Sequence, residues 1–302
     1  MAAKLIERIA LIGFGEAGGI LGADLAKSGV SVSIFDILLR AEPSRAAMLA
    51  KAKSANVRAC ESLVEAIRDA EVIISAVTCS SAPDVAGESS TTLRPDQLYL
   101  DINSVSPDTK RKMAERVESA GAHFVEAAVM APVPPSRLRV PMLLGGARAA
   151  ELAPRLQALG MDVQAVSDRI GVASAIKLCR SVVIKGIEAL AVEAMFAARY
   201  YGAEEAVLAS LDSTYPSMGW KDKLPDYLIS RVAQHGKRRA AEMREVAETL
   251  TDAGLEPFTA LGTAKRQDWL AEIMAEHGIQ YRPSDPFSWR VLADALAKVR
   301  TS

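Results

Sequence analysis

The feature that most constrains the fold is a glycine-rich turn close to the start of the chain. The apolar residues 8–12 lead directly into the sequence GFGEAG at 13–18, and a pattern of helical period follows and ends at Gly29. Residues 30–35 read VSVSIF, which is a strand pattern, and Asp36 comes directly after them. This order predicts a strand, a tight turn, a helix and a second strand that ends in an acidic residue.

Such an order is typical of a dinucleotide-binding unit. The first glycine permits the tight turn, the second lets backbone N–H groups approach a pyrophosphate, and the third allows the helix to pack closely on the strand. Asp36 would accept hydrogen bonds from the adenosine ribose, which favours NAD, whereas Arg40 and Arg45 could reach a 2′-phosphate and leave NADP open. In the turn, the predicted cofactor-binding residues are Gly13, Phe14, Gly15, Glu16, Ala17 and Gly18.

Strand and helix patterns alternate over the first half of the chain. Strand patterns recur at 56–60, 71–77, 97–102, 123–129 and 142–146, with helical patterns such as 61–69 and 106–120 between them. The alternation predicts an α/β fold with a mostly parallel, doubly wound sheet that binds ligands at the carboxyl ends of its strands. Val77, Thr78 and Asn103 follow such ends and are predicted to contact the cofactor.

Residues 171–198 predict one long buried helix that is apolar almost all round. At 100° per residue its polar side chains form a single stripe, which consists of Lys177, Arg180, Ser181, Lys185 and Glu188. Lys185 and Glu188 are three residues apart and are expected to form a local ion pair. Lys177 has no acidic residue at i±3 or i±4, so its charge needs a partner or a ligand from elsewhere. It is the leading functional candidate.

The remainder, residues 203–302, carries helical patterns only. We therefore expect a dinucleotide-binding Rossmann domain at 1–168, and at 169–302 a long interdomain helix followed by an all-helical domain for substrate binding and dimerisation. The three tryptophans of this region are expected in its core. Lys237, Arg238 and Arg239 are followed by acidic residues at helical spacing, which predicts a solvated helix face.

Composition narrows the function classes. The chain has 302 residues, 50% of them hydrophobic, and 36 basic against 37 acidic residues give a net charge of −1. A net charge this small provides no overall electrostatic field that would attract nucleic acid or an anionic membrane. No apolar run reaches the roughly 20 residues of a membrane span. Three cysteines without CxxC spacing suit reduced thiols in a cytoplasm. Three widely separated histidines predict no metal site.

The order of motifs resembles the β-hydroxyacid dehydrogenase superfamily, which includes 6-phosphogluconate dehydrogenase-like enzymes. The resemblance rests on GFGEAG at 13–18, DINSVSP at 101–107, GAHFVEAAVMAP at 121–132 and GVASAIKLCRS at 171–181. It implies that Lys177 is the proton-transfer residue, that Asn103 sits near the nicotinamide, and that the long helix helps to form a homodimer.

The chain departs from the family at the substrate motif. Where the family has Ser-Gly-Gly to hold a substrate carboxylate, this chain has Met130, Ala131 and Pro132, and Arg180 and Ser181 replace two asparagines. Carboxylate capture by backbone N–H groups is in doubt because proline has none. Either Arg180 supplies the missing anion partner, or the substrate carries no carboxylate.

These residues predict an NAD(P)-dependent dehydrogenase or reductase acting on the CH–OH group of a small hydroxy acid or related alcohol. Hydride would pass between nicotinamide and the alcohol or carbonyl carbon, Lys177 would move the proton, and Ser181 would orient the substrate hydroxyl. An imine or ketimine reductase is one alternative, and a non-catalytic dinucleotide-binding sensor is the other.

Overall fold

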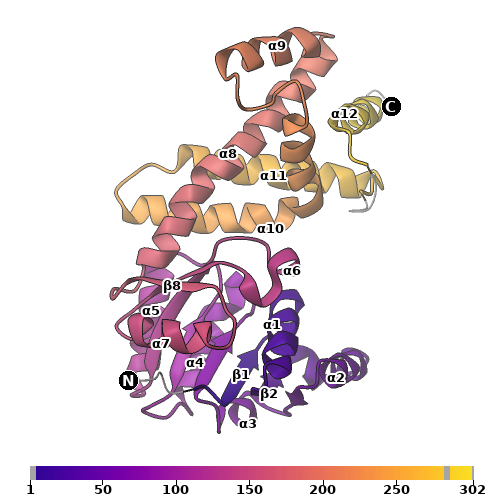
Figure 1. Cartoon of the computed structure of the whole chain (residues 1–302). Helices are drawn as coiled ribbons and strands as arrows, with labels where there is room; N and C mark the ends of the chain where they lie inside the picture. Colours follow the sequence, from indigo (N-terminus) through magenta and orange to yellow (C-terminus); the bar gives the residue numbers. More distant parts are fainter. Residues whose placement is uncertain (1–4, 282–285, 301–302) are drawn as a thin grey trace. The chain divides into compact units, whose positions relative to one another are not determined.

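The chain divides into two compact units, Met1–Lys177 and Leu178–Ser302. The structure, a computed structural model shown in Figure 1, describes residues 5–281 and 286–300. Among these residues no helix combines the length and the apolar character needed to cross a bilayer.

The first unit is built on an eight-stranded sheet of order β3-β2-β1-β4-β5-β6-β7-β8. Every neighbouring pair is parallel except β6 and β7. The strands are β1 (Arg8–Ile12), β2 (Ser31–Phe35), β3 (Arg58–Ala59), β4 (Val72–Ser75), β5 (Leu98–Asp101), β6 (His123–Val129), β7 (Met142–Gly145) and β8 (Val163–Ser167). The predicted α/β fold with a mostly parallel, doubly wound sheet is confirmed.

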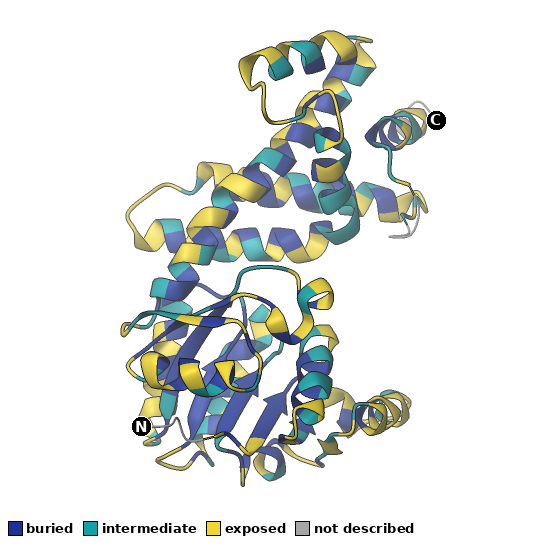
Figure 2. Ribbon diagram, viewed as in Figure 1, coloured by how far each residue is buried: buried dark blue, intermediate teal, exposed yellow. Residues whose placement is uncertain are grey.

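Helices connect these strands and cover both faces of the sheet. The connecting helices are α1 (Glu16–Lys27), η1 (Ile37–Arg40), α2 (Ser44–Ser54), α3 (Leu63–Ile67), η2 (Cys79–Ser81), α4 (Ala82–Ser90), α5 (Pro107–Ser119), α6 (Val133–Ser136), η3 (Arg137–Arg139) and α7 (Ala149–Gln157). All residues of β4 and β5 are buried, and Figure 2 shows the sheet as the most buried part of this unit. Burial on both faces explains why these strands are apolar up to their last residues, Ser75 and Asp101.

The strand order places the candidate site. β1 pairs with β2 on one side and with β4 on the other, so the chain crosses from one half of the sheet to the other beside β1. In doubly wound sheets ligands bind at the carboxyl ends of the strands at this reversal. The glycine turn follows β1 at this position, and residues 76–78 follow β4.

Helix α8 (Val172–Tyr200) begins in the first unit and continues into the second. The other helices of the second unit are α9 (Glu204–Thr214), α10 (Leu224–Asp252), α11 (Phe258–Glu276) and α12 (Trp289–Arg300). No strand occurs among its described residues, as predicted. Trp220 and Trp289 are buried in one cluster, and the partly buried Trp269 packs against it.

The predicted ion pair between Lys185 and Glu188 is wrong. Lys185 instead pairs with Glu242, and Glu188 pairs with Arg239, so both charges of α8 find partners on α10. Helix spacing does not reveal a partner on another helix, and burial of both side chains makes such a partner necessary. Arg239 is therefore buried, which corrects the prediction that the basic cluster at 237–239 is a solvated face.

The prediction that the long helix is buried almost all round is also wrong. Val183 and Leu190 are 60% and 64% exposed, and Ile184 is exposed as well. Val183 and Leu190 are seven positions apart and therefore lie on one side of α8, and Ile184 is next to Val183, so the helix presents an apolar stripe to solvent in the single chain. Figure 2 shows the alternation of buried and exposed residues along α8.

Candidate functional site

The glycine turn after β1 is shaped by close backbone packing. Gly13 has φ +89°, a conformation that favours glycine, and a Cβ there would overlap the carbonyl oxygen of Ala76. A Cβ at Gly18 would overlap the carbonyl oxygen of Gly13. At Gly15 a Cβ would meet no atom within 4 Å. The outer two glycines thus join β1, α1 and β4, while the middle one faces open space, as expected of a turn that lies against a pyrophosphate.

Asp36 holds this turn from the end of β2. Its carboxylate accepts the backbone N–H of Phe14 at 2.6 Å and that of Leu38 at 2.9 Å, and the side chain is buried. A carboxylate has about four acceptor positions, so two backbone donors leave capacity for ribose hydroxyls. The structure therefore adds a second task to Asp36, which is to orient the turn itself.

The two arginines near Asp36 differ in their contacts. Arg45 donates to the Leu39 carbonyl oxygen and to Glu61, each at 2.6 Å, and Glu61 raises the pKa of Arg45 above its ordinary value. Arg40 lies 5.2 Å above the ring of Phe35 and reaches Glu88 only at 3.4 Å, with both side chains half exposed. Of the two arginines, Arg40 has the weaker contacts and is the more available to a 2′-phosphate.

Asn103 stands at the centre of a buried polar network at the carboxyl ends of β4 and β5. Its Nδ2 donates to Ser75 Oγ at 2.9 Å and to the carboxylate of Asp101. Lys110 of α5 pairs with the same carboxylate and donates to the Asp101 carbonyl oxygen at 3.0 Å. All four residues are buried, so the orientation of the Asn103 amide is fixed. After the carboxyl end of β4, Val77 lies against the glycine turn and Thr78 Oγ1 contacts Ser81 Oγ at 2.9 Å.

Lys177 joins this edge of the sheet from α8. Its Nζ donates to Ser104 Oγ, next to Asn103 in the sequence. Lys177 is partly buried, as a group that reaches from a helix into a site would be. The structure thus brings Lys177 together with the DINSVSP segment at 101–107. Sequence reasoning had assigned no role to Ser104.

Glu126, in the middle of β6, fixes the start of α8. This fully buried carboxylate accepts backbone N–H groups from Gly171 at 2.7 Å and Ala173 at 3.0 Å, and the Ser174 hydroxyl at 2.6 Å. A carboxylate at a helix N-terminus satisfies unpaired donors and complements the helix dipole. Because Ser174 is one turn before Lys177, Glu126 also sets the position of the lysine. An acid within an otherwise apolar strand was the sequence signal for it.

The segment that replaces the family's Ser-Gly-Gly offers few donors to an anion. Met130 donates its N–H to the Pro141 carbonyl oxygen at 2.9 Å, and Pro132 has no N–H. Farther along the same loop, Arg137 forms a two-bond contact with Asp24 of α1. The segment that contains Ala131 is therefore attached to α1, the helix that follows the glycine turn.

The remaining two predicted site residues follow Lys177 on α8. Arg180 is exposed and forms no ion pair among the described residues, whereas Ser181 is buried. Both lie about one helical turn after the lysine.

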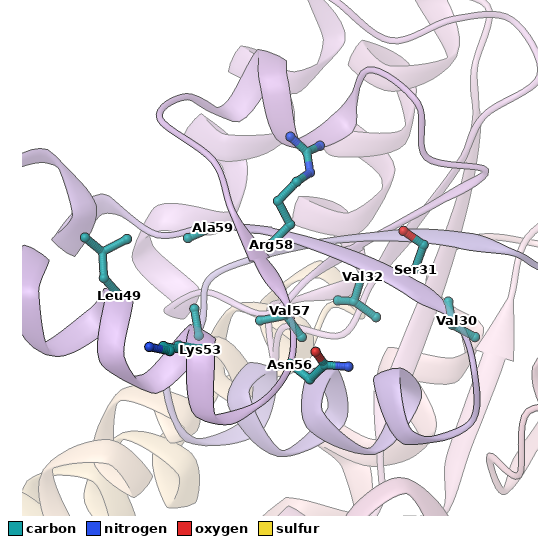
Figure 3. A pocket seen from close by; sticks show the side chains of 10 residues that line it. Val30, Ser31, Val32, Leu49, Lys53, Asn56, Val57, Arg58 and Ala59 are labelled. Carbon is teal, nitrogen blue, oxygen red and sulfur yellow. The ribbon is translucent and has the colours of Figure 1, made fainter.

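A separate hollow lies away from these residues. Figure 3 shows it at the amino end of β2 and beside the short edge strand β3. Its lining includes Val32, Leu49, Lys53, Asn56 and Arg58. The glycine turn and Asp36 lie at the opposite, carboxyl end of β2, so this hollow is not part of the candidate site.

Two family profiles match the chain. The profile described as the NAD binding domain of 6-phosphogluconate dehydrogenase matches residues 8–167, and the Domain of unknown function (DUF1932) matches residues 198–270. The first match contains the glycine turn, Asp36 and the Asn103 network. It shows that the first unit is an NAD(P)-binding domain.

Known proteins resemble the chain over most of its length. A conserved hypothetical protein from Sinorhizobium meliloti, whose structure is solved, is 34% identical with a TM-score of 0.80, over 98% of this chain and 97% of that one. An uncharacterized 28.5 kDa protein of Methanothermus fervidus is 28% identical over 83% of this chain and 94% of its own length. The 3-hydroxyisobutyrate dehydrogenase of Pseudomonas aeruginosa is 25% identical over 70% of this chain and 71% of its own.

A solved imine reductase from Bacillus cereus is 17% identical with a TM-score of 0.56, over 98% of this chain and 99% of that one. At this identity the likeness is one of fold alone. The profile match over residues 8–167 and the similarity to the Sinorhizobium protein are the stronger findings. By the profile match, which covers more than half of its residues, the chain belongs to the β-hydroxyacid dehydrogenase superfamily, with an NAD(P)-binding domain of the 6-phosphogluconate dehydrogenase type.

Proposed function

We propose that this protein is an NAD(P)-dependent oxidoreductase that acts on the CH–OH group of a small hydroxy acid or related alcohol, with Lys177 as the general acid and base. The observation that carries the proposal is the contact of the Lys177 ammonium with Ser104, beside the fixed amide of Asn103. A bound nicotinamide supplies hydride to a carbonyl carbon or takes it from an alcohol carbon. In reduction Lys177 gives a proton to the oxygen that becomes the hydroxyl, and in oxidation it takes that proton back.

The cofactor is held by the glycine turn. Gly15 leaves room for a pyrophosphate, and the N-terminus of α1 presents backbone N–H groups to it. Asp36 favours NAD, because its carboxylate accepts ribose hydroxyls and repels a 2′-phosphate. Arg40 is the residue through which NADP could still bind. We expect a lower KM for NADH than for NADPH.

The substrate is assigned to the Met130-Ala131-Pro132 segment and Arg180. The Met130 N–H is already bonded and Pro132 has none, which supports Arg180 as the partner of a substrate carboxylate. Ser181, on the same turn of α8, orients the substrate hydroxyl. A matched pair of substrates tests whether the substrate carries a carboxylate. The pair is 3-hydroxyisobutyrate, the substrate named for the Pseudomonas relative, and 2-methyl-1,3-propanediol, which has the same skeleton without a carboxylate.

The test is Lys177→Ala, with Lys265→Ala on an exposed position of α11 as its control. We expect Lys177→Ala to lower kcat by about 10²–10⁴-fold, the usual contribution of a positioned acid or base, and to leave NADH affinity unchanged. Arg180→Ala should raise the KM of the carboxylate substrate and not that of the diol. Full turnover by a Lys177→Ala variant that binds NADH normally would refute the proposed role.

Two other outcomes would redirect the assignment. Turnover of cyclic imines without turnover of hydroxy acids would identify an imine or ketimine reductase. Tight binding of NAD(H) or NADP(H) with no turnover of carbonyls, alcohols or imines would identify a dinucleotide-binding sensor.

The assembly and location are also proposals. The exposed apolar stripe of Val183, Ile184 and Leu190 supports a homodimer that uses α8. A cytoplasmic location rests on the three cysteines, which all lie in the described part of the chain and form no disulfide there. The domain boundary at 168/169 and the absence of a nucleic-acid or membrane partner stay predictions.

A further inference from the structure

Lys51, on α2, contacts the glycine turn although it lies more than thirty residues away in the sequence. Its Nζ donates to the carbonyl oxygen of Phe14 and to that of Gly15, each at 2.6 Å. The same ammonium lies 5.0 Å above the Phe14 ring. Two consecutive carbonyl groups of the turn therefore point at one cation.

This contact favours one direction for two N–H groups, and the Gly19 N–H, which donates to the Gly15 carbonyl oxygen at 3.1 Å, supports the same direction for the second. In a trans peptide unit the C=O and N–H bonds point in opposite directions, because the unit is planar. The Phe14 carbonyl shares its unit with the Gly15 N–H, and the Gly15 carbonyl shares its unit with the Glu16 N–H. When Lys51 holds both carbonyl oxygens on its own side, the N–H groups of Gly15 and Glu16 are turned to the other side.

Those N–H groups belong to the start of α1. The N-cap residue of α1 is Gly15, which provides no side-chain cap, so the first donors of the helix are not satisfied by a neighbouring side chain. A pyrophosphate is the acceptor that such a glycine turn serves. On the opposite flank, Asp36 accepts the Phe14 N–H at 2.6 Å. The turn is thus oriented by a carboxylate at an N–H group and by an ammonium at its carbonyl groups.

Gly19 provides the room for Lys51. A Cβ at Gly19 would stand 2.8 Å from both Cε and Nζ of Lys51, so a larger residue there would push the ammonium off the turn. Gly19 is not one of the three glycines of the predicted motif. Its position in the first turn of α1 has this separate physical reason.

We propose that Lys51 is a positioning residue for the cofactor pyrophosphate, which acts by orienting the Gly15 and Glu16 N–H groups, and that Gly19 is present to admit it. The inference rests on the proposed function in that it requires dinucleotide binding. It concerns the phosphate portion of the cofactor and is independent of the substrate and of Lys177.

The experiment measures binding of NAD⁺, ADP and adenosine by calorimetry. Lys51→Ala should weaken NAD⁺ and ADP about tenfold, the loss expected when one hydrogen bond to a charged group is misdirected, and should leave adenosine binding unchanged. Lys53→Ala, an exposed lysine of the same helix, is the matched control and should change none of the three. Adenosine separates the phosphate effect from a general effect on the fold.

Gly19→Ala is the second variant. Alanine is a better helix former than glycine, so this variant should fold at least as well as the wild type, yet it should weaken ADP binding as Lys51→Ala does. The double variant should bind ADP no more weakly than either single variant, since both remove the same contact.

Three results would overturn the inference: unchanged ADP affinity in Lys51→Ala, equal weakening of ADP and adenosine, or losses that multiply in the double variant. A wild-type protein that binds neither NAD⁺ nor ADP would instead overturn the proposed function, and this inference with it.

Discussion

The stability of the first unit should depend on the charge of Glu126. The carboxylate receives four donors from the start of α8: one Oε accepts the Gly171 and Ala173 N–H groups, and the other accepts the hydroxyl and, at 3.3 Å, the N–H of Ser174. Gly145 admits the carboxylate, because a Cβ there would stand 2.5 Å from Oε1. A Glu126→Gln substitution keeps the volume and removes the charge and one acceptor.

The cost follows from where the new NH₂ group can lie. The NH₂ group costs less where it faces Ser174, because the Ser174 hydroxyl can rotate and accept a hydrogen bond from it. In this orientation only the Ser174 N–H is left without an acceptor. A buried unsatisfied donor costs about 1–3 kcal/mol, and a lost charge at a partly buried helix N-terminus costs up to about 2 kcal/mol. The sum is about 1–5 kcal/mol, which lowers the Tm of a unit of this size by on the order of 10 °C.

Two measurements check this prediction. Calorimetry should show the fall in Tm, and amide hydrogen exchange should be faster at Gly171, Ala173 and Ser174 in Glu126→Gln. The control is Glu118→Gln on the exposed side of α5, which should stay within about 0.5 kcal/mol of the wild type. If Glu126→Gln melts and exchanges like Glu118→Gln, the carboxylate does not hold the start of α8.

Two further predictions concern the second unit. Burial, together with three neighbouring arginines of α10, lowers the pKa of His235 to about 4. As pH falls from 6.5 to 4, the unfolded chain therefore binds a proton at His235 before the folded chain does, and the free energy of unfolding should fall. His235→Gln should make the free energy of unfolding less dependent on pH over this range. Light scattering should give twice the 32.2 kDa chain mass for the wild type and the single mass for Val183→Glu/Leu190→Glu, while Val291→Glu, equally exposed on α12, should stay dimeric. A pH profile that His235→Gln leaves unchanged, or a wild type that is monomeric at micromolar concentration, would contradict these predictions.

Local patterns were sufficient to predict most of the fold. The strand–turn–helix unit and the alternation of elements depend on neighbouring residues, so β1 to β7 and the long helix α8 were found from the sequence. β8 was missed because Val163–Ser167 is only partly buried and therefore lacks a continuous apolar run. The buried extent of α8 was overestimated, since periodicity identifies an apolar face and not what covers it.

The candidate site was predicted where motifs carry it and missed where side chains arrive from other elements. Lys110 shows why. It occupies an apolar stripe of α5, together with Met113, Ala114 and Val117, so the sequence indicates that this lysine is buried. Its partner, Asp101, lies on a different element, and one sequence gives no information on which acid that is.

The same physics separates two kinds of site residue in this chain. The glycines and Asn103 belong to motifs whose residue types and spacing can be recognised in the sequence. Asp36, Lys51, Glu126 and Lys110 instead hold backbone or side-chain groups of those motifs in one orientation, through bonds that join distant parts of the first unit. A buried charge is retained only where it has partners, so the buried Asp36, Glu126 and Lys110 must each have such a contact in the folded protein. Lys51 is exposed, and its two carbonyl contacts hold it at the turn. On the role proposed for Lys51, a relative that keeps the glycine turn but has a neutral residue at this position should bind the cofactor more weakly.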